Sequence, residues 1–315
     1  MPDLSIVTTM FRSEPFIGEF HARASAAARA LGGTYEIVFV DDGSPDRSLD
    51  LVRELARSDP CVRIVELSRN FGHHIAAYAA IEAARGDRVF LIDSDLEEHP
   101  EWLAEFDKVM KAKNADVVFG VQADAAGARG MSGLFYRVFN ALSEVYIPPH
   151  ACTVRLMCRA YVDSLTQLRD HKLFMAGMFM WTGFNQVGVP VDKGRRSAGK
   201  STYNLRRQVG LFIDAITSFS SKPLYAAFFV GSGLATAAGA IGAFMVGRKL
   251  LFPDTVLAGF TALFVSILFI GGLIILFLGV IGIYLSKIFA EVKDRPLYIA
   301  RPASETSHRQ AGSTP

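Results

Sequence analysis

The sequence predicts an α/β domain with a mostly parallel sheet, followed by an amphipathic helix at a membrane surface and a transmembrane helical hairpin. Three observations lead to this prediction. Short apolar segments alternate with helical patterns over residues 4–121, as in βαβ units. Polar clusters follow three of these apolar segments. Two long stretches nearer the carboxyl end contain no charged residue.

Strands and helices alternate along the first part of the chain. Short β-branched or apolar runs predict strands at residues 4–9, 35–40, 62–67, 89–92 and 116–121. Helical spacing of apolar residues predicts helices that end near residue 30, begin at residue 48, and span residues 74–84, 101–113 and 134–146. Residues 150–195 mix short strands and helices. In a parallel sheet of this kind, ligands bind beyond the carboxyl ends of the strands.

The composition excludes several functions. Of the 315 residues, 50% are hydrophobic, which suits a water-soluble domain joined to a membrane segment. Lys and Arg total 33 against 31 for Asp and Glu, so the chain carries no general charge for binding nucleic acid. The cysteines Cys61, Cys152 and Cys158 match no zinc spacing and are expected to be reduced thiols in the cytosol. The N-terminus lacks the basic and apolar regions of a signal peptide.

The stretch Arg88–Glu101, with the sequence RVFLIDSDLEEHPE, carries the strongest candidate site. Its apolar half leads to Asp93 and Asp95, and two carboxylates at the end of a buried strand are costly without a positive partner. Mg²⁺ or Mn²⁺ suits them, because such ions take oxygen ligands and keep positions for phosphate oxygens. Glu97 could add a third ligand. The alternative is a capped turn, with Asp95 as the N-cap of a helix that starts near Glu97.

Two other predicted strands also end in polar residues. Asp41–Asp46 (DDGSPD) follows the second strand, and Ser68–Gly72 (SRNFG) follows the third. Because the carboxyl ends of parallel strands meet at one edge of a sheet, we expect the three clusters to form one site. Later in the chain, the basic run Lys193–Ser201 is expected to stay flexible until it meets an anion. The alternatives for this run are a solvated loop and contact with anionic lipid.

Two apolar stretches predict a transmembrane hairpin at residues 224–246 and 256–285, each longer than the ~20 residues that span a bilayer. More basic residues flank this pair than occupy its short link, so the positive-inside rule places the soluble domain and both termini in the cytoplasm, at the inner cell membrane. Residues 204–222 have one apolar face, as in a helix that lies in the membrane interface. The tail at residues 287–315 is expected to be largely disordered. Small residues in the first span permit close packing of helices and hence a homo-oligomer.

Four motifs make the sequence similar to a known family. They are VDDGSPD at residues 40–46, SRNFGHHIAA at 68–77, DSDLEEHPE at 93–101 and RSAGKSTY at 196–203, followed by SFSSKPL and the two spans. In this order they resemble the family 2 glycosyltransferases, and within them the branch that acts on polyprenyl phosphates such as bactoprenol or dolichol phosphate. The resemblance covers residues 4–295. It implies the GT-A fold, with a cytoplasmic glycosyltransferase domain at residues 1–203.

The resemblance also implies a nucleotide-sugar donor, linked to UDP or GDP, and a metal ion. The donor would be bound by residues from all four motifs, namely Asp41, Asp42, Ser68, Arg69, Asn70, Asp93, Ser201 and Tyr203. Asp93, Asp95 and Glu97 would hold Mg²⁺ or Mn²⁺ on the donor diphosphate. The residues implied in catalysis are Asp93, Asp95 and Arg196. Candidates for binding the acceptor phosphate are Arg129, Arg137 and Arg155.

This chain departs from the family pattern at two positions. His73 stands where relatives often have a lysine, which favours a packed or solvated histidine without a role. Thr153 stands where relatives often have a carboxylate, so a candidate base is absent. Residues 172–191 also contain no carboxylate, although a sugar hydroxyl acceptor needs a general base. A phosphate monoester, which loses its second proton near pH ~6, needs none.

These observations predict an inverting, metal-dependent transfer of a sugar from a nucleotide donor to polyprenyl phosphate on the cytoplasmic leaflet. Two alternatives stay open: transfer to a hydroxyl group of a lipid-linked glycan, and an inactive glycosyltransferase-like membrane scaffold. The retained DDGS, DSD and RxxGxSxY motifs weigh against the scaffold. Glucose, mannose, galactose and aminosugar donors are all compatible with the sequence.

Overall fold

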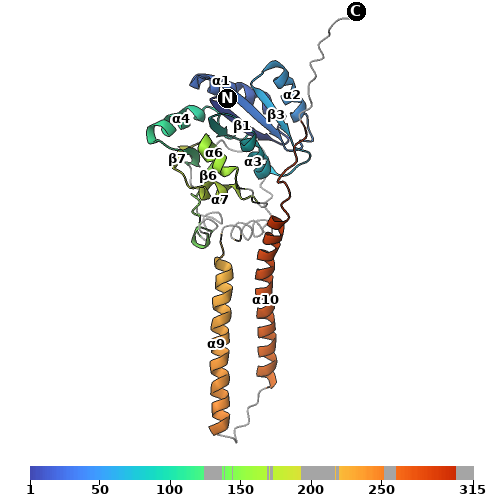
Figure 1. The fold of residues 1–315 in the computed structure, drawn as a ribbon, viewed down its shortest axis with the longest axis vertical. Coiled ribbons are helices and arrows are strands. Elements are labelled where there is room, and N and C mark those ends of the chain that lie inside the picture. The colour runs from blue at the N-terminus through green and yellow to red at the C-terminus, as the bar shows by residue number, and fades with distance from the viewer. Residues whose placement is uncertain are drawn as a thin grey trace, which may run out of the picture. The chain divides into compact units, whose positions relative to one another are not determined.

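The computed structural model of the chain describes residues 1–123, 137, 139–143, 145–168, 170, 173–192, 217, 220–251 and 260–302. The chain divides into two compact units. Unit 1 comprises residues 1–136, 147–202 and 296–315, and unit 2 comprises residues 137–146 and 203–295. In the described part of the chain, unit 1 is an α/β domain and unit 2 contains two long helices (Figure 1).

The described sheet of unit 1 has seven strands in the order β3-β2-β1-β4-β6-β5-β7. The strands are β1 (Leu4–Met10), β2 (Tyr35–Asp41), β3 (Val62–Glu66), β4 (Arg88–Leu91), β5 (Val117–Gln122), β6 (Ala151–Cys158) and β7 (Gln186–Val191). All neighbouring pairs are parallel except those of β6, which runs antiparallel to β4 and β5. The prediction of a mostly parallel sheet is confirmed. β6 and β7 lie in the region whose sequence pattern did not separate strands from helices.

Helices cover both faces of this sheet. They are α1 (Ile17–Leu31), α2 (Ser48–Ser58), α3 (His73–Ala83), α4 (Trp102–Lys113), α6 (Arg159–Leu165) and α7 (Met175–Trp181). β2 is buried from Glu36 to Asp41, and because alternate residues of a strand point to opposite faces, both faces need cover. α1 packs with α2 and α4, whereas α3 contacts β1, β2 and β4 from the opposite face (Figure 1).

The chain reverses its direction across the sheet at β1. It passes from β1 through β2 to β3 at one edge, and it then places β4 on the other side of β1. In open α/β sheets, ligands bind beyond the carboxyl ends of the strands at such a reversal. The topology therefore predicts a site where β1, β2 and β4 end.

A buried carboxylate joins the first three strands near their amino ends. Glu36 of β2 accepts hydrogen bonds from Ser5 Oγ of β1 and from Arg63 Nη1 of β3, both at 2.6 Å. It also accepts one from the Arg85 backbone N–H at 2.8 Å. Burial alone would raise the pKa of Glu36, but these hydrogen bonds and the Arg63 charge lower the pKa below its ordinary value of 4.5. The network thus holds the strands in register through an ionised side chain.

Unit 2 contains α9 (Lys222–Leu251) and α10 (Phe260–Val292). By length and composition both helices can cross a membrane, since mean hydropathy is 1.6 over Lys222–Ile241 and 2.4 over Phe269–Val292, and neither stretch is buried. The two helices contact each other where Gly231 leaves room for the Phe277 ring. α10 continues to Val292, beyond the predicted end of the span at residue 285.

The segments that flank the two helices can be compared with the prediction only in part. Of the predicted interfacial helix at residues 204–222, all but residues 217 and 220–222 lie outside the described residues. The predicted disordered tail differs from the structure in its first part. Residues 287–292 belong to α10, and residues 296–302 belong to unit 1, where Ala300 forms an antiparallel bridge with Leu67.

Glu36→Gln is expected to lower the free energy of unfolding of the detergent-solubilised protein by roughly 1–3 kcal/mol at pH ~7, because the buried donors lose a charged acceptor. The folded-state pKa lies below 4.5. The stabilisation by the native carboxylate is therefore fully present above pH 4.5 and is lost as the pH falls through the folded-state pKa. Thermal unfolding of both proteins from about pH 7 to about pH 3.5 measures this difference. A difference in Tm that does not shrink at the acid end would contradict the assignment.

Candidate active site

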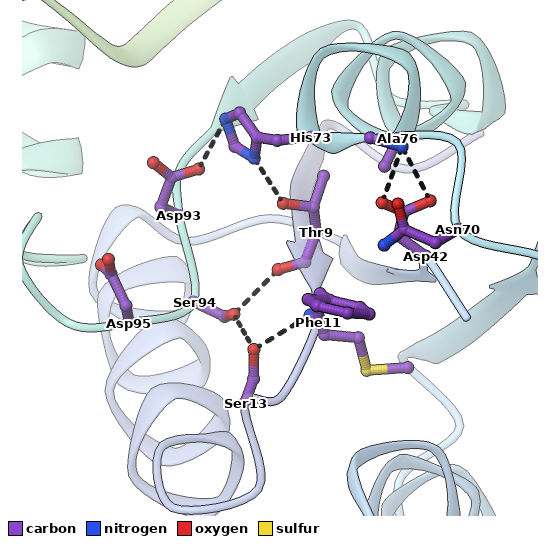
Figure 2. Close-up of a pocket in the computed structure, with 12 residues that line it drawn as sticks. Thr9, Phe11, Ser13, Asp42, Asn70, His73, Ala76, Asp93, Ser94 and Asp95 are labelled. Atoms are coloured by element: carbon purple, nitrogen blue, oxygen red, sulfur yellow. Dashed lines mark hydrogen bonds and ion pairs between the residues drawn. The ribbon is translucent and has the colours of Figure 1, made fainter. Parts of the chain in front are cut away.

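A cavity of about 480 Å³ lies beyond the carboxyl ends of β1, β2 and β4. Four segments that follow strands supply its lining, which consists of Thr9, Met10, Phe11, Ser13, Asp42, Asn70, Gly72, His73, Ala76, Asp93, Ser94 and Asp95. Figure 2 shows these side chains around the cavity. The structure thus brings together residues from all three polar clusters that the sequence placed at strand ends.

The end of β1 forms one wall of the cavity and is joined to the end of β4. Ser94 Oγ donates a hydrogen bond to the Thr9 carbonyl oxygen at 2.8 Å (Figure 2). The same hydroxyl lies 3.2 Å from Ser13 Oγ, which accepts a hydrogen bond from the Phe11 N–H. The sequence predicted β1 but no site residue after it. The signal was present in TTMFRS, where polar residues follow the apolar part of the strand.

The two aspartates after β2 have different surroundings. Asp41 is 2% exposed and is not part of the cavity lining. Its Oδ1 accepts a hydrogen bond from the Ser44 N–H at 3.0 Å, and burial raises its pKa. Asp42 lines the cavity, and its carboxylate accepts hydrogen bonds from the N–H groups of Phe71 at 2.6 Å and Gly72 at 3.0 Å. Asp41 thus shapes the turn, and its predicted contact with a nucleotide-sugar donor stays a prediction.

The loop after β3, residues 68–72, lies close against the turn after β2. Gly43 has a φ of +68°, and a Cβ atom there would lie 2.8 Å from the Asn70 backbone nitrogen, so the turn requires glycine. Asn70 lines the cavity. The Arg69 guanidinium stacks on a neighbouring phenylalanine ring, 3.9 Å from its centroid. Neither Arg69 nor Ser68 is part of the cavity lining, so their contact with a donor stays a prediction.

Asp93 and Asp95 line the cavity just beyond β4. The Asp93 side chain is 21% exposed, and its Oδ1 lies 3.6 Å from His73 Nε2. His73 Nδ1 lies 3.3 Å from Thr9 Oγ1, so the imidazole connects the ends of β1 and β4 (Figure 2). The sequence favoured a histidine without a role at this position, whereas the structure places His73 in the wall of the cavity. The signal was its place in SRNFGH, directly before the predicted helix at residues 74–84.

The two carboxylates fit a divalent cation that is shared with a diphosphate. Mg²⁺ is commonly held by one or two carboxylates together with phosphate oxygens, and Asp93 and Asp95 both line the cavity. Among the described residues, no group of three or more His, Cys, Asp or Glu side chains is placed to hold a metal. Asp95 Oδ1 accepts the Glu97 N–H at 3.0 Å, so Asp95 caps this turn, although α4 begins only at Trp102. Glu97 is not part of the lining, and its role as a third ligand stays a prediction.

A second, smaller cavity of about 80 Å³ shares His73 with the first. Its lining comes from β4, α3, β6 and α7 and includes His73, His74, Ala77, Leu91, Ala151, Cys152, Thr153, Arg155, Met175, Ala176 and Phe179. In the sheet, Arg155 of β6 pairs with Leu91, the last residue of β4. The second cavity therefore lies beside the same strand end that carries Asp93.

Arg155 places a buried cation with an unused donor in the second cavity. The residue is 2% exposed, and its guanidinium lies over the Phe179 ring, 3.2 Å from the centroid. Nε and Nη2 donate hydrogen bonds to the Thr153 and Cys152 carbonyl oxygens, while Nη1 has no hydrogen-bond partner among the described residues. Burial lowers the pKa of Arg155 to about 10, although the neighbouring Tyr161 side chain and, to a smaller extent, the charge of Glu98 act to raise the pKa, so the group stays charged at neutral pH. A buried charge that lacks a bonded counterion favours an anionic ligand.

Besides Asp41, Ser68, Arg69 and Glu97, which are not part of either cavity lining, five further predicted site residues cannot be placed in either cavity. Arg129, Arg196, Ser201 and Tyr203 lie outside the described residues. Arg137 is an exposed residue of unit 2, whereas both cavities belong to unit 1. The roles of these five residues stay predictions.

Comparisons with a family model and with individual proteins point to the same family. Residues 5–150 match the model of Glycosyl transferase family 2. A protein of Mycobacterium tuberculosis (strain CDC 1551 / Oshkosh) that is provisionally named a glycosyltransferase is 43% identical over 301 residues, which cover 95% of this chain and 87% of that protein. The SfII prophage-derived bactoprenol glucosyl transferase of Shigella flexneri is 34% identical over 310 residues, which cover 97% of this chain and 98% of that protein.

Among solved structures, the mannosyltransferase PcManGT from Pyrobaculum calidifontis is 17% identical with a TM-score of 0.45, covering 93% of this chain and 86% of that chain. The sequence relatives are far more similar, and their likeness extends over both units. Such identity over nearly the whole length shows common ancestry of the whole chain. The chain is a glycosyltransferase and belongs to glycosyltransferase family 2.

Proposed function

We propose that this glycosyltransferase moves a sugar from a nucleotide-sugar donor to a polyprenyl phosphate at the cytoplasmic face of the cell membrane. The observation that carries the proposal is an acidic cavity beyond the carboxyl ends of β1, β2 and β4 in unit 1, in a chain whose unit 2 holds two exposed apolar helices. Similarity over nearly the whole chain to a bactoprenol glucosyl transferase supports the lipid acceptor.

The larger cavity is proposed to bind the donor as a UDP- or GDP-linked sugar. Asp42 and Asn70 offer polar atoms to the base and ribose at the β2 side of the cavity. Asp93 and Asp95 lie at the end of β4, where the diphosphate would follow. The RSAGKSTY motif at residues 196–203 is proposed to close over the phosphates, since arginine engages phosphate oxygens with two N–H groups at once.

Asp93 and Asp95 are the residues that would hold Mg²⁺ or Mn²⁺. Such an ion, when bound, stabilises the negative charge that develops on the leaving nucleoside diphosphate. The contribution of the chain itself is positioning. The hydrogen bond from Ser94 to Thr9 keeps the ends of β1 and β4 together, so the donor contacts on these strands are fixed relative to each other before the substrates bind.

The acceptor phosphate is proposed to act as the nucleophile. One of its oxygens attacks the anomeric carbon, the new C–O bond forms while the bond to the nucleoside diphosphate breaks, and the configuration at that carbon inverts. A phosphate monoester that has lost its second proton near pH ~6 needs no general base. In line with this, none of the described residues that line the cavity around Arg155 is Asp or Glu.

Arg155 is proposed to bind the acceptor phosphate. Its buried Nη1 offers N–H groups to the second cavity, and hydrogen bonds between a guanidinium and a phosphate are strong because both groups are charged. The shared wall at His73 places this cation next to the proposed donor site. Arg129 and Arg137 are proposed as additional contacts of the lipid phosphate.

Charge and hydropathy support a proposal for the membrane arrangement. We propose that α9 and α10 cross the inner membrane as a hairpin with both termini in the cytoplasm, because basic residues flank the pair of helices. The segment at residues 204–222 is proposed to lie in the membrane interface. Small residues of α9, such as Gly233 and Gly239, would permit helix packing in a homo-oligomer.

The direct test uses purified protein, undecaprenyl phosphate, Mg²⁺ or Mn²⁺, and a panel of UDP- and GDP-sugars, with mass spectrometry of the lipid fraction. We expect one donor to yield a glycolipid that carries a single added sugar. No glycolipid with any donor, while an active relative succeeds in parallel, would reject the proposal. A product formed only on a lipid-linked glycan would favour the hydroxyl acceptor, and a protein that is not stabilised by any nucleotide would favour the scaffold.

Asp95→Asn is expected to lower the transfer rate roughly 100-fold or more, because one of the two proposed metal-binding carboxylates is lost. The free energy of unfolding should change by less than about 1 kcal/mol, since the side chain lies at the rim of a polar cavity. Steady-state kinetics and thermal unfolding measure the two effects separately. The matched control is Asp50→Asn, an exposed aspartate of α2, which should alter neither. Loss of folding with Asp95→Asn would instead assign this residue to turn capping.

Arg155→Ala is expected to raise the KM for the lipid phosphate by roughly 10- to 100-fold, because a charge-assisted contact to the acceptor is removed. The affinity for UDP or GDP should stay within about twofold of the native value. Arg155→Lys keeps the charge but loses the planar fork, so an intermediate KM is expected, and it decides the question if the alanine variant does not fold. Arg57→Ala, at an exposed position of α2, is the control. An unchanged KM for the lipid in both Arg155 variants would remove Arg155 from the acceptor site.

A further inference from the structure

The segment at residues 297–301, here called the strap, returns to unit 1 and pairs with the end of the edge strand β3. Ala300 and Leu67 form an antiparallel bridge. On one side of this bridge the Ser68 N–H donates to the Ile299 carbonyl oxygen at 2.8 Å, and on the other the Arg301 N–H donates to the Glu66 carbonyl oxygen at 2.7 Å. The strap therefore extends the sheet at an edge that would otherwise present unpaired backbone groups.

Two side chains of the strap add contacts to different elements of unit 1. Arg301 Nη1 lies 2.9 Å from Glu66 Oε1, and the other oxygen of this carboxylate is bonded by Arg53 of α2. Tyr298 Oη donates a hydrogen bond to Glu82 Oε2 of α3 at 2.8 Å. The Arg301 side chain is 60% exposed, so its ion pair with Glu66 adds little by itself. The backbone hydrogen bonds and the Tyr298 contact are thus the main attachments.

The strap holds both elements that flank the loop at residues 68–72. The Ile299 carbonyl oxygen of the strap accepts a hydrogen bond from the N–H of Ser68, the first residue of this loop. Its Tyr298 donates a hydrogen bond to Glu82 in the last turn of α3, the helix whose first turn carries His73 and Ala76. Between these two anchors, the loop itself bonds the Asp42 carboxylate through its last two N–H groups. The loop is therefore held by the strap at its first residue, Ser68, and by Asp42 at its last two residues.

The strap is also the direct continuation of the second apolar helix. α10 ends at Val292, and only residues 293–296 separate it from the strap in the sequence. We propose that the strap is a positioning element for the donor nucleotide, through which the end of α10 is tied to the loop that binds the nucleoside. The inference rests on the proposed function in assuming that the larger cavity binds a nucleotide. A loop held in its binding conformation loses less freedom when the ligand binds, so the strap raises donor affinity without touching the donor.

The test compares two shortened chains. A chain that ends at Pro302 keeps the strap, and a chain that ends at Arg295 lacks it. Calorimetric titration with UDP and with GDP, each in the presence of Mn²⁺, measures nucleotide affinity without the lipid. We expect the Kd of the bound nucleotide to rise roughly tenfold when the strap is missing and to stay within about twofold when it is present. In transfer assays, the KM for the donor should rise in the same way while kcat changes less. Native affinity in the chain that ends at Arg295 would overturn the proposal.

Point variants separate the backbone contacts from the side-chain contacts. Arg301→Ala keeps the N–H that donates to Glu66, and Arg301→Pro removes it, so only the proline variant should weaken nucleotide binding clearly. Tyr298→Phe should weaken binding through loss of the Glu82 contact. Hydrogen exchange at residues 67–72 gives a readout that needs no nucleotide, since Ser68 should exchange faster when the strap is absent. Failure of the full-length chain to bind UDP or GDP would reject the proposed function. Unchanged hydrogen exchange at residues 67–72 would reject the proposed role of the strap, whether or not the full-length chain binds a nucleotide.

Discussion

The cavity depends on the contact between the Asp42 carboxylate and the backbone N–H groups of Phe71 and Gly72. This contact joins the end of β2 to the loop that leads into α3, so it sets the width of the cavity between them. Asp42 is 3% exposed, and a buried carboxylate that accepts backbone hydrogen bonds cannot be replaced without leaving those donors unpaired. It also lies near the amino end of α3, where the helix dipole favours negative charge. The residue that would meet the nucleoside is thus also the residue that forms its binding wall.

The charges around the larger cavity limit what can bind there. Its described lining contains Asp42, Asp93 and Asp95 but no Lys or Arg, and Arg69 of the adjacent loop stacks on a phenylalanine. Two like charges about 4 Å apart repel by roughly 4 kcal/mol at the effective dielectric constant of a protein surface. A diphosphate placed next to Asp93 and Asp95 would therefore be rejected unless positive charge enters with it. A divalent cation at these two acids, together with the basic run at residues 193–201, would supply that charge.

The sequence could predict most of this site because parallel strands end at a common edge. The alternation of elements was enough to place Asp42, Asn70 and Asp93 together. The site residues at the end of β1 were missed because the polar residues in TTM continue a β-branched strand. No turn residue marks the point where the strand ends. β6 was missed because its pattern is interrupted by the buried Arg155, which only the family resemblance selected. The strap was missed because strand pairing between segments so far apart in the sequence leaves no local signal.

Arg155 would give the proposed acceptor site a physical basis for selectivity. An arginine that is 2% exposed and has an unused N–H group carries a desolvation cost in the free protein. A phosphate offsets this cost with both charge and hydrogen-bond acceptors, whereas an unphosphorylated prenol offers only one neutral hydroxyl group. A cavity of about 80 Å³ next to His73 leaves room for a small anion but little else. Since a buried charge penalises ligands that leave it unpaired, the same residue that would bind the lipid phosphate would also reject the free alcohol.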